Sequence, residues 1–175
     1  MSVEMNVETD RNWFLLTSKP HKDEVAEFQL RNQGYDVYRP LAKRLRTHRG
    51  KIITKIESLF PRYMFIHLDD GVNDNWAPIR STTGISSFVR FGTEPARVPE
   101  ALIRALQEQE AMLGERAIDL DSFHTGDKVV ITDGPFRGLD AIFQKYDGQE
   151  RVIVLLEILH KQTKLALSPA QLYAA

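Results

Sequence analysis

A short segment in the first half of the chain restricts the possible folds more than any other feature. Residues 59–68 (LFPRYMFIHL) end in an alternating pattern. The two sides of that extended stretch are both largely apolar: Tyr63, Phe65 and His67 on one, Met64, Ile66 and Leu68 on the other. A strand of this kind belongs in the centre of a sheet that is covered on both faces. The segment therefore predicts a layered domain.

The neighbouring segments supply the strands and helices for such layers. Strand patterns occupy residues 13–16, 35–38 and 86–91, and residues 76–80 suit a helical turn. One helix is expected from Asp23 to a stop at Gly34, with Val25, Ala26, Phe28 and Leu30 on its buried face. Another is expected over residues 100–112, with Leu102, Ile103 and Leu106 as its apolar stripe. Strands and helices in this order predict an α+β sandwich.

Residues 41–57 have the pattern of a β-hairpin whose tip lies at residues 48–50. The stretch from Arg39 to Lys55 is rich in basic residues and contains no acid: Arg39, Lys43, Arg44, Arg46, Arg49, Lys51 and Lys55. A finger with this charge suits nucleic-acid phosphates, which give affinity rather than sequence choice. The alternative is a solvated edge strand whose charges prevent aggregation.

The chain divides into an N-terminal domain over residues 10–112, an acidic linker over 113–124 and a C-terminal domain over 125–175. Residues 139–146 and 151–159 can be strands of a small five-stranded barrel. Residues 151–159 (RVIVLLEIL) can equally form a helix with Val152, Leu155, Leu156 and Leu159 on one stripe. Periodicity does not decide between the two.

Composition excludes several classes of function. The chain has no cysteine, and its five histidines form no metal-ligand pair, so we expect no metal site and no cofactor. It contains no phosphate-binding loop or nucleophile motif, which argues against an enzyme. The polar, acidic start is unlike a signal peptide, and no run of about 18 apolar residues suits a membrane. We expect a cytoplasmic, monomeric protein that does not bind membranes.

Two motifs resemble one family. Residues 59–66 (LFPRYMFI) resemble the NusG family of transcription elongation factors, and residues 126–138 (GDKVVITDGPFRG) look like its KOW motif. They occur in the family's order and at a fitting separation. A KOW-type RNA-binding or ribosome-associated protein without a polymerase role is the alternative, but such a protein would not need the preceding domain.

Within that family the chain is most similar to the specialised RfaH-like paralogues, through residues 87–92 (SFVRFG) and 141–143 (AIF). The resemblance implies a factor that binds RNA polymerase at the β′ clamp helices and suppresses pausing and termination. It also implies a KOW barrel that recruits other factors, among them a small-subunit ribosomal protein. In RfaH the C-terminal domain can instead be a helical hairpin that masks the polymerase site, and the alternative here is a permanent barrel.

The resemblance also assigns roles to residues. The polymerase-binding patch corresponds to Phe60, Tyr63, Phe65, Phe88, Phe91, Ile103 and Leu106, although aromatic residues on strands are usually part of a core. The RfaH interdomain salt bridge corresponds to Glu57 and Arg151, and Leu155 and Leu159 belong to the same interdomain contact.

Contact with the DNA of the elongation complex is expected from two places. Lys19 corresponds to a DNA-contacting residue of RfaH, and His21 and Lys22 adjoin it. The hairpin adds Lys43, Arg44, Arg46, Arg49 and Lys51. Other residues depart from RfaH: Thr83 replaces an arginine, and residues 73–80 lack the His-Thr-Thr-Thr stretch that meets the β subunit. Recognition of the same DNA element is therefore not implied.

Overall fold

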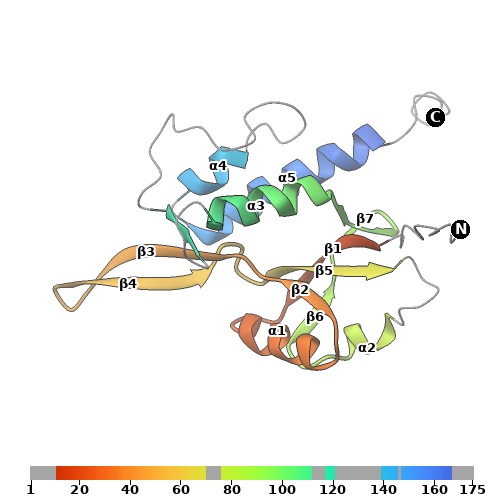
Figure 1. Ribbon diagram of the computed structural model, residues 1–175, viewed down its shortest axis with the longest axis horizontal. Coiled ribbons are helices and arrows are strands. Elements are labelled where there is room, and N and C mark those ends of the chain that lie inside the picture. Colours follow the sequence, from red (N-terminus) through yellow and green to blue (C-terminus); the bar gives the residue numbers. More distant parts are fainter. Residues whose placement is uncertain (1–10, 70–75, 112–116, 121–138, 146, 167–175) are drawn as a thin grey trace, which may run out of the picture.

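An antiparallel sheet lies at the centre of the computed structural model, which describes residues 11–69, 76–111, 117–120, 139–145 and 147–166 (Figure 1). Its strands follow the order β2-β5-β1-β6, and β9 pairs with β1 as well. Their bounds are β1 Arg11–Ser18, β2 Asp36–Tyr38, β5 Tyr63–Asp69, β6 Ile85–Phe88 and β9 Arg97–Val98. Strand β5 has β1 on one side, with Leu15 opposite Phe65, and β2 on the other. The predicted central strand is thus confirmed.

Helices cover both faces of this sheet. On the face below the sheet in Figure 1 lie α1 (Asp23–Asn32) and α2 (Ala77–Arg80), and above it lie α3 (Glu100–Ala111), α4 (Leu139–Gln144) and α5 (Gly148–Ala166). The alternation within β5 separates two cores. Met64, Ile66 and Leu68 pack on the α1 side, and Phe65 packs on the side of α3, α4 and α5.

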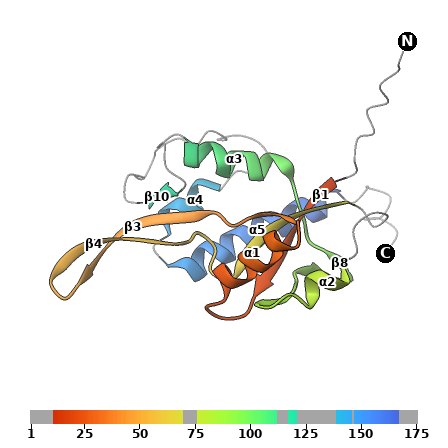
Figure 2. The ribbon, with the colours of Figure 1, turned by 60° about the horizontal axis from the view of Figure 1, so that its bottom comes forward.

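A long hairpin of β3 (Leu41–His48) and β4 (Lys51–Ser58) projects from this layered body (Figures 1 and 2). The two tip residues, Arg49 and Gly50, both have positive φ, which fits a type I′ turn. At its base, the short strand β10 (Ile118–Asp119) runs parallel to β3. Strands β7 (Arg90–Phe91) and β8 (Glu94–Pro95) form a second, much smaller hairpin. The hairpin predicted from the sequence, with its tip, is confirmed.

Two helix predictions meet different outcomes. The stripe Leu102, Ile103 and Leu106 of α3 is buried, as predicted. On α1 only Ala26 and Leu30 are buried, whereas Val25 and Phe28 are exposed, so their assignment to the core was wrong. The sheet touches a narrow stripe of this helix, and Val25 and Phe28 lie on the turns beside it.

The C-terminal part is helical where it is described. Residues 139–144 form α4 rather than part of the strand expected over residues 139–146, and residues 151–159 adopt the helical alternative within α5. The helix is favoured because it places Val152, Leu155 and Leu159 together against the sheet domain. The KOW-like residues 126–138 lie outside the described residues, as does most of the expected linker. Within the described ranges, no helix is long and apolar enough to cross a membrane.

Candidate functional site

Six of the seven residues that the resemblance assigned to polymerase binding share one side of the sheet. We call them the aromatic face: Phe60, Tyr63, Phe65, Phe91, Ile103 and Leu106. Strand β5 and the turn before it position Phe60, Tyr63 and Phe65, while α3 positions Ile103 and Leu106. Tyr63 and Phe91 are partly buried, and the other four are buried. Phe88 lies in the opposite core, where its ring stacks on Trp76, and so does not join this face.

Helices α4 and α5 cover the aromatic face. They contribute buried side chains to the same core as the aromatic face: Ile142, Phe143, Val152, Leu155, Ile158 and Leu159. The two predicted interdomain leucines, Leu155 and Leu159, are fully buried there. At the start of α5, Gly148 sits so close to Pro61 that an added Cβ would overlap the proline ring. The aromatic face is therefore occupied by a helix in this structure.

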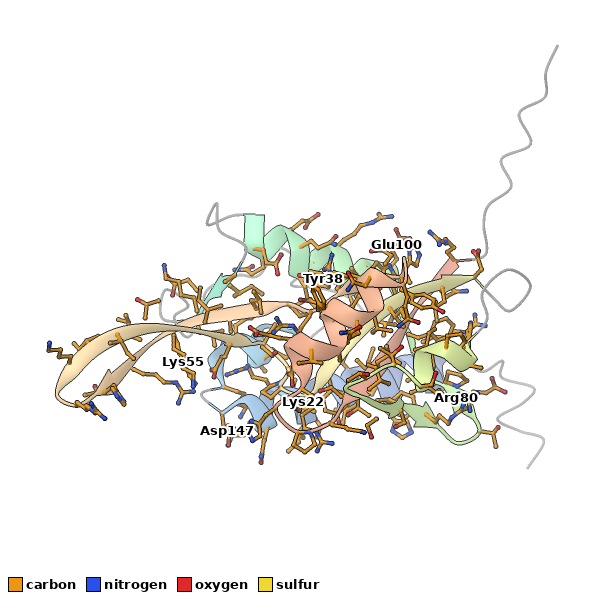
Figure 3. All side chains as sticks on the ribbon, turned by 90° about the horizontal axis from the view of Figure 1, so that it is seen from below. Lys22, Tyr38, Lys55, Arg80, Glu100 and Asp147 are labelled. Carbon is orange, nitrogen blue, oxygen red and sulfur yellow. The ribbon has the colours of Figure 1, made fainter. Side chains whose placement is uncertain are left out.

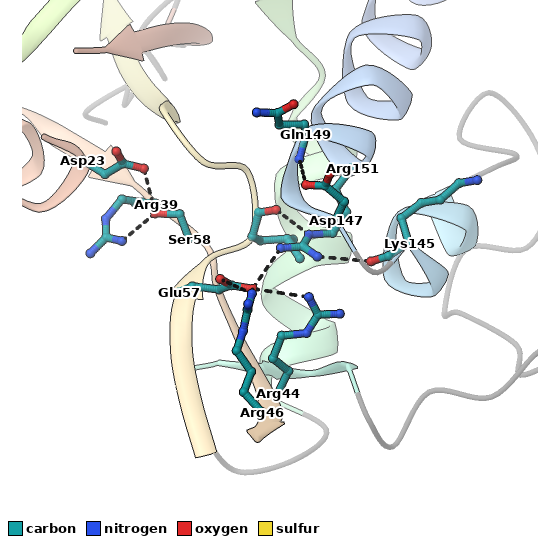
Figure 4. A network of polar contacts seen from close by, with 11 residues as sticks. Asp23, Arg39, Arg44, Arg46, Glu57, Ser58, Lys145, Asp147, Gln149 and Arg151 are labelled. Atoms are coloured by element: carbon teal, nitrogen blue, oxygen red, sulfur yellow. Dashed lines mark hydrogen bonds and ion pairs between the residues drawn. The ribbon is translucent and has the colours of Figure 1, made fainter. Parts of the chain in front are cut away.

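Arg151 anchors α5 at the base of the hairpin (Figure 4). Its side chain is 0% exposed, and its guanidinium donates from Nε to the Leu59 carbonyl at 2.7 Å and from an Nη to the Lys145 carbonyl at 3.1 Å. A further Nη lies 3.4 Å from a carboxylate oxygen of Glu57. Burial lowers the pKa of Arg151, and the Glu57 charge opposes that shift. The residues that the resemblance paired are thus in contact here.

Glu57 is shared between three arginines. Besides Arg151, the guanidinium of Arg46 lies 3.1 Å from its carboxylate and that of Arg44 lies 3.7 Å away (Figure 4). Arg44 is buried, so in this conformation it belongs to the ion cluster rather than to a surface that DNA could reach. The sequence placed Arg44 with the DNA-contacting residues because periodicity does not show which basic side chain folds back on an acid.

The projecting part of the hairpin has two unlike faces. Because side chains alternate and the strands pair in register, one face holds Leu45, Ile52 and Ile56 together with Lys43, Thr47 and Thr54. The other face holds the charged side chains: Arg44, Arg46, His48, Lys51, Lys55 and Glu57, with Ile53 among them. Ile52 is 73% exposed, and Figure 3 shows side chains extending into solvent along the hairpin. Most of the predicted phosphate contacts therefore lie on one face, with Lys43 on the other and Arg49 at the tip.

A second basic surface surrounds the loop before α1. Lys19, His21 and Lys22, all assigned to DNA contact, are exposed on this loop. Asp23 holds this loop in place. Its carboxylate accepts hydrogen bonds from Ser18 Oγ at 3.2 Å, from Ser58 Oγ at 2.9 Å and from the backbone N–H of Arg62 at 2.7 Å. Asp23 therefore ties the loop to the end of β4 and to the turn that precedes β5.

Neither Asp23 nor Arg62 was singled out from the sequence as a site residue. Residues 60–63 form a turn in which the Tyr63 N–H donates to the Phe60 carbonyl at 2.9 Å, and Arg62 has φ of 72°. This geometry matches a type II turn, which favours proline at its second position and glycine at its third. A side chain other than glycine costs about 1–2 kcal/mol there. The sequence did contain one signal for this turn: Pro61 stands at its second position, and the third position holds Arg62 where glycine is usual.

These features define a class of protein: an α+β binding domain with helices on both faces of its sheet, a basic hairpin and an aromatic face that is covered by a helix. Comparison with known proteins narrows the class. The family model described as "Transcription termination factor nusG" matches residues 11–107. The chain therefore belongs to the NusG family of transcription termination and antitermination factors, which are not enzymes.

Individual relatives agree with this assignment. The Thermus thermophilus protein described as "Transcription termination/antitermination protein NusG" is 26% identical over 161 residues, covering 86% of each chain. A NusG of Streptomyces virginiae is 28% identical over 129 residues, and the match spans 64% of this chain but 43% of the longer relative. A solved structure, "Domain interaction in Thermotoga maritima NusG", is 19% identical with a TM-score of 0.37 over 58% of both chains. That last similarity is too low to compare the folds in detail.

Proposed function

We propose that this protein is an RfaH-like member of the family that binds RNA polymerase through the aromatic face and suppresses pausing and termination. The observation that supports the proposal best is the cover on that face. Helix α5 lies against it with Leu155 and Leu159 buried, so the face is shaped to receive an apolar helix. The β′ clamp helices of polymerase are the expected competitor for the same surface.

The cover then has a regulatory meaning. While α5 occupies the aromatic face, a second helix has no room there, and the factor is autoinhibited. Release separates Arg151 from Glu57, which keeps Arg44 and Arg46 as partners. The Glu57 carboxylate therefore still has cationic partners in the open state, which lowers the free-energy cost of releasing α5. Two states of one chain that differ by a few kcal/mol can interconvert in this way.

After release, we propose that residues 125–175 refold into the KOW barrel and recruit further factors, including a small-subunit ribosomal protein, with residues 113–124 as the linker. The apolar character of residues 151–159 at nearly every position supports this, because the same segment suits a buried strand. The N-terminal domain would keep its fold, since α1 and α2 cover one face of its sheet and α3 still covers part of the other.

DNA of the elongation complex is the second proposed ligand. Towards its tip the charged face of the hairpin is exposed, at His48, Lys51 and Lys55, and so is the loop with Lys19, His21 and Lys22. Their cations would contact phosphates and supply affinity and orientation. The alternative of a KOW-type RNA-binding protein gains no support, because the family match falls on residues 11–107 rather than on the KOW-like segment.

The test measures co-elution of the full chain with core RNA polymerase. Wild-type protein should bind weakly, and Glu57→Ser should bind more strongly. Breaking a buried ion pair by removing one partner costs about 3–5 kcal/mol, and here the helix can leave instead. Adding Tyr63→Ala to Glu57→Ser should weaken binding again, because Tyr63 is a partly exposed member of the aromatic face.

The matched control is Glu94→Ser, which removes an exposed carboxylate from β8 and should change nothing. Equal co-elution of wild type, Glu57→Ser and the double variant, each folded by circular dichroism, would contradict the proposal. Strong binding of wild type and Glu57→Ser alike, with weaker binding of the double variant, would leave a polymerase-binding factor without autoinhibition.

A further inference from the structure

The turn at residues 60–63 places an arginine where backbone geometry favours glycine. Arg62 has φ of 72° after Pro61, in the third position of the turn. Arg62 is the one residue of this turn with a positive φ, so the backbone strain of the turn is confined to it. Strained residues that the surrounding structure holds in place are concentrated at functional sites.

Three hydrogen bonds hold Arg62 in this conformation. Its backbone N–H donates to Asp23, its carbonyl accepts from the Ser18 N–H at 2.7 Å, and its side-chain Nε donates to the Ser18 carbonyl at 3.1 Å. The last bond orients the plane of the guanidinium, because it joins Nε to the carbonyl of Ser18, the residue that precedes Lys19. Asp23 is itself held by Ser18 and Ser58, and Ser58 in turn accepts from Arg39 at 2.8 Å (Figure 4).

The outer edge of the guanidinium is left for a ligand. Arg62 is exposed, and its two terminal nitrogens make no hydrogen bond or ion pair to any residue in the described ranges. An arginine presents parallel N–H groups that match two oxygens of a phosphate, and one already oriented loses less freedom on binding. Its Nε is thus used for positioning, and its two terminal nitrogens remain for a ligand.

The surroundings favour an anion. The Ser18 carbonyl that orients Arg62 is followed directly by the loop with Lys19, His21 and Lys22, and all three of these residues are exposed. Two acids follow the loop directly in the sequence: Asp23 has both carboxylate oxygens engaged, and Glu24 is exposed on α1. The loop and Arg62 together therefore carry an excess of positive charge.

We propose that Arg62 is a DNA-backbone contact: it binds a phosphate beside the Lys19–Lys22 loop and sets the position of the strand on that surface. The proposal rests on the proposed function, in which this loop faces DNA. A nucleic-acid phosphate fits better than a protein carboxylate, because adjacent exposed cations on one loop match the closely spaced charges of a polynucleotide.

The experiment titrates the full chain with a fluorescein-labelled oligonucleotide, single-stranded and duplex, at several salt concentrations. Arg62→Gly removes the strain and the side chain, and Arg62→Gln keeps a chain of similar reach without the charge. Both should weaken DNA binding by about 3- to 10-fold and reduce the magnitude of the salt slope by about 0.7–0.9. Arg62→Lys should fall between them and the wild type. Thermal midpoints should stay near the wild-type value, because Arg62→Gly exchanges strain for a lost hydrogen bond.

Arg104→Gln on α3 is the matched control: it removes one exposed positive charge on the opposite side of the sheet and should leave affinity and slope unchanged. Arg62 variants with wild-type affinity and slope would overturn the inference. So would variants that lose co-elution with polymerase but keep DNA affinity, since Arg62 would then meet a protein carboxylate. If the wild-type chain does not bind DNA at all, and a Lys51→Gln hairpin variant behaves in the same way, the DNA part of the proposed function is wrong together with this inference.

Discussion

The two faces of the central sheet are covered by different parts of the chain. On one face, α1 and α2 pack over Phe14, Ile66 and Leu68, and every member of that core comes from residues 14–88. On the other face, α3 packs beside α4 and α5, which come from beyond the region matched by the family model. The first cover is built from the segments that also form the sheet, whereas much of the second is supplied by a distant segment.

This difference separates folding from regulation. A core made of nearby segments forms with the domain and is lost only when the domain unfolds. A cover made by a distant segment can leave as a unit, provided that the face beneath it is stable or finds another partner. In the proposed function the same kind of apolar burial therefore has two roles, folding on one face and regulation on the other, and the position of the covering segment in the chain distinguishes them.

The largest expected effect comes from a matched pair of substitutions, one on each face. Phe14 and Phe143 are both buried, at 1% and 2% exposure. Removing a buried phenylalanine side chain costs about 3–5 kcal/mol. Phe14→Ala should lower the free energy of unfolding of the sheet domain by that amount, measured in urea. Phe143→Ala should leave the sheet domain almost unchanged and release α4 and α5.

Amide hydrogen exchange distinguishes the two outcomes. Phe14→Ala should increase exchange throughout β1 and β5, and Phe143→Ala only in α4 and α5. If Phe143→Ala destabilises β1 as much as Phe14→Ala does, both faces belong to one cooperative unit, and the comparison between them is invalid.

Gly148 gives a smaller effect with an unusual combination of signs. An added methyl group would overlap Pro61, and overpacking of this kind costs about 1–3 kcal/mol. Alanine is nevertheless the better helix former, although the full gain of about 1 kcal/mol applies to a helix interior and Gly148 is the first residue of α5. Gly148→Ala should therefore weaken the docking of α5 while slightly favouring the helix itself. Because the chain has no cysteine, a single cysteine introduced on α5 can carry a fluorescent label, and the anisotropy of that label reports docking of the helix.

Gln149→Ala is the control, since Gln149 is exposed and adjacent in sequence. Docking of α5 that is unchanged in Gly148→Ala would show that the contact with Pro61 is not part of the closed state in solution.

The smallest expected effect is a pH dependence confined to the sheet domain. The Tyr38 hydroxyl donates to Glu110 at 2.8 Å and links β2 to α3. Burial raises the pKa of Glu110 above its ordinary 4.5, although hydrogen bonds from Tyr38 and the Leu41 backbone oppose that shift. The folded state therefore binds the proton more tightly than the unfolded state. This contribution is full below the ordinary pKa and is lost as pH rises through the raised pKa.

Glu110→Gln imitates the protonated carboxyl and should raise the thermal midpoint at neutral pH. Its advantage over wild type should shrink as pH falls toward and below the ordinary value of 4.5. An advantage that grows on acidification would mean that the folded state prefers the carboxylate.

Much of the sheet domain could be predicted from the sequence, because local patterns determine it. The alternation in residues 59–68 indicated a strand with two buried faces, and the hairpin tip was visible in the turn sequence. Burial on α1 could not be predicted in the same way, since Phe28 fits a helical stripe yet is 60% exposed. Whether residues 151–159 form a helix depends on what they contact, and a run that is apolar at nearly every position suits either structure.

The candidate site was less accessible to prediction. Motif resemblance brought most of the aromatic face together, but strand parity placed Phe88 on the other side of the sheet. Arg44 and Arg46 looked equivalent in the sequence, and only their positions relative to Glu57 distinguish the buried one from the half-exposed one. Arg62 was missed because its importance depends on the sign of one backbone angle.

The hairpin's two faces have a consequence for how this finger could evolve. Which side is cationic depends on odd and even positions counted from the Arg49–Gly50 turn, not on which residues are present. Inserting one residue before the turn would move the side chains of β3 to opposite faces relative to those of β4. Composition, net charge and reach would barely change, yet Leu45 would then lie among lysines and Arg46 among isoleucines. A one-residue change in loop length would thus remove the proposed phosphate-binding surface, although the net charge of the hairpin would stay the same.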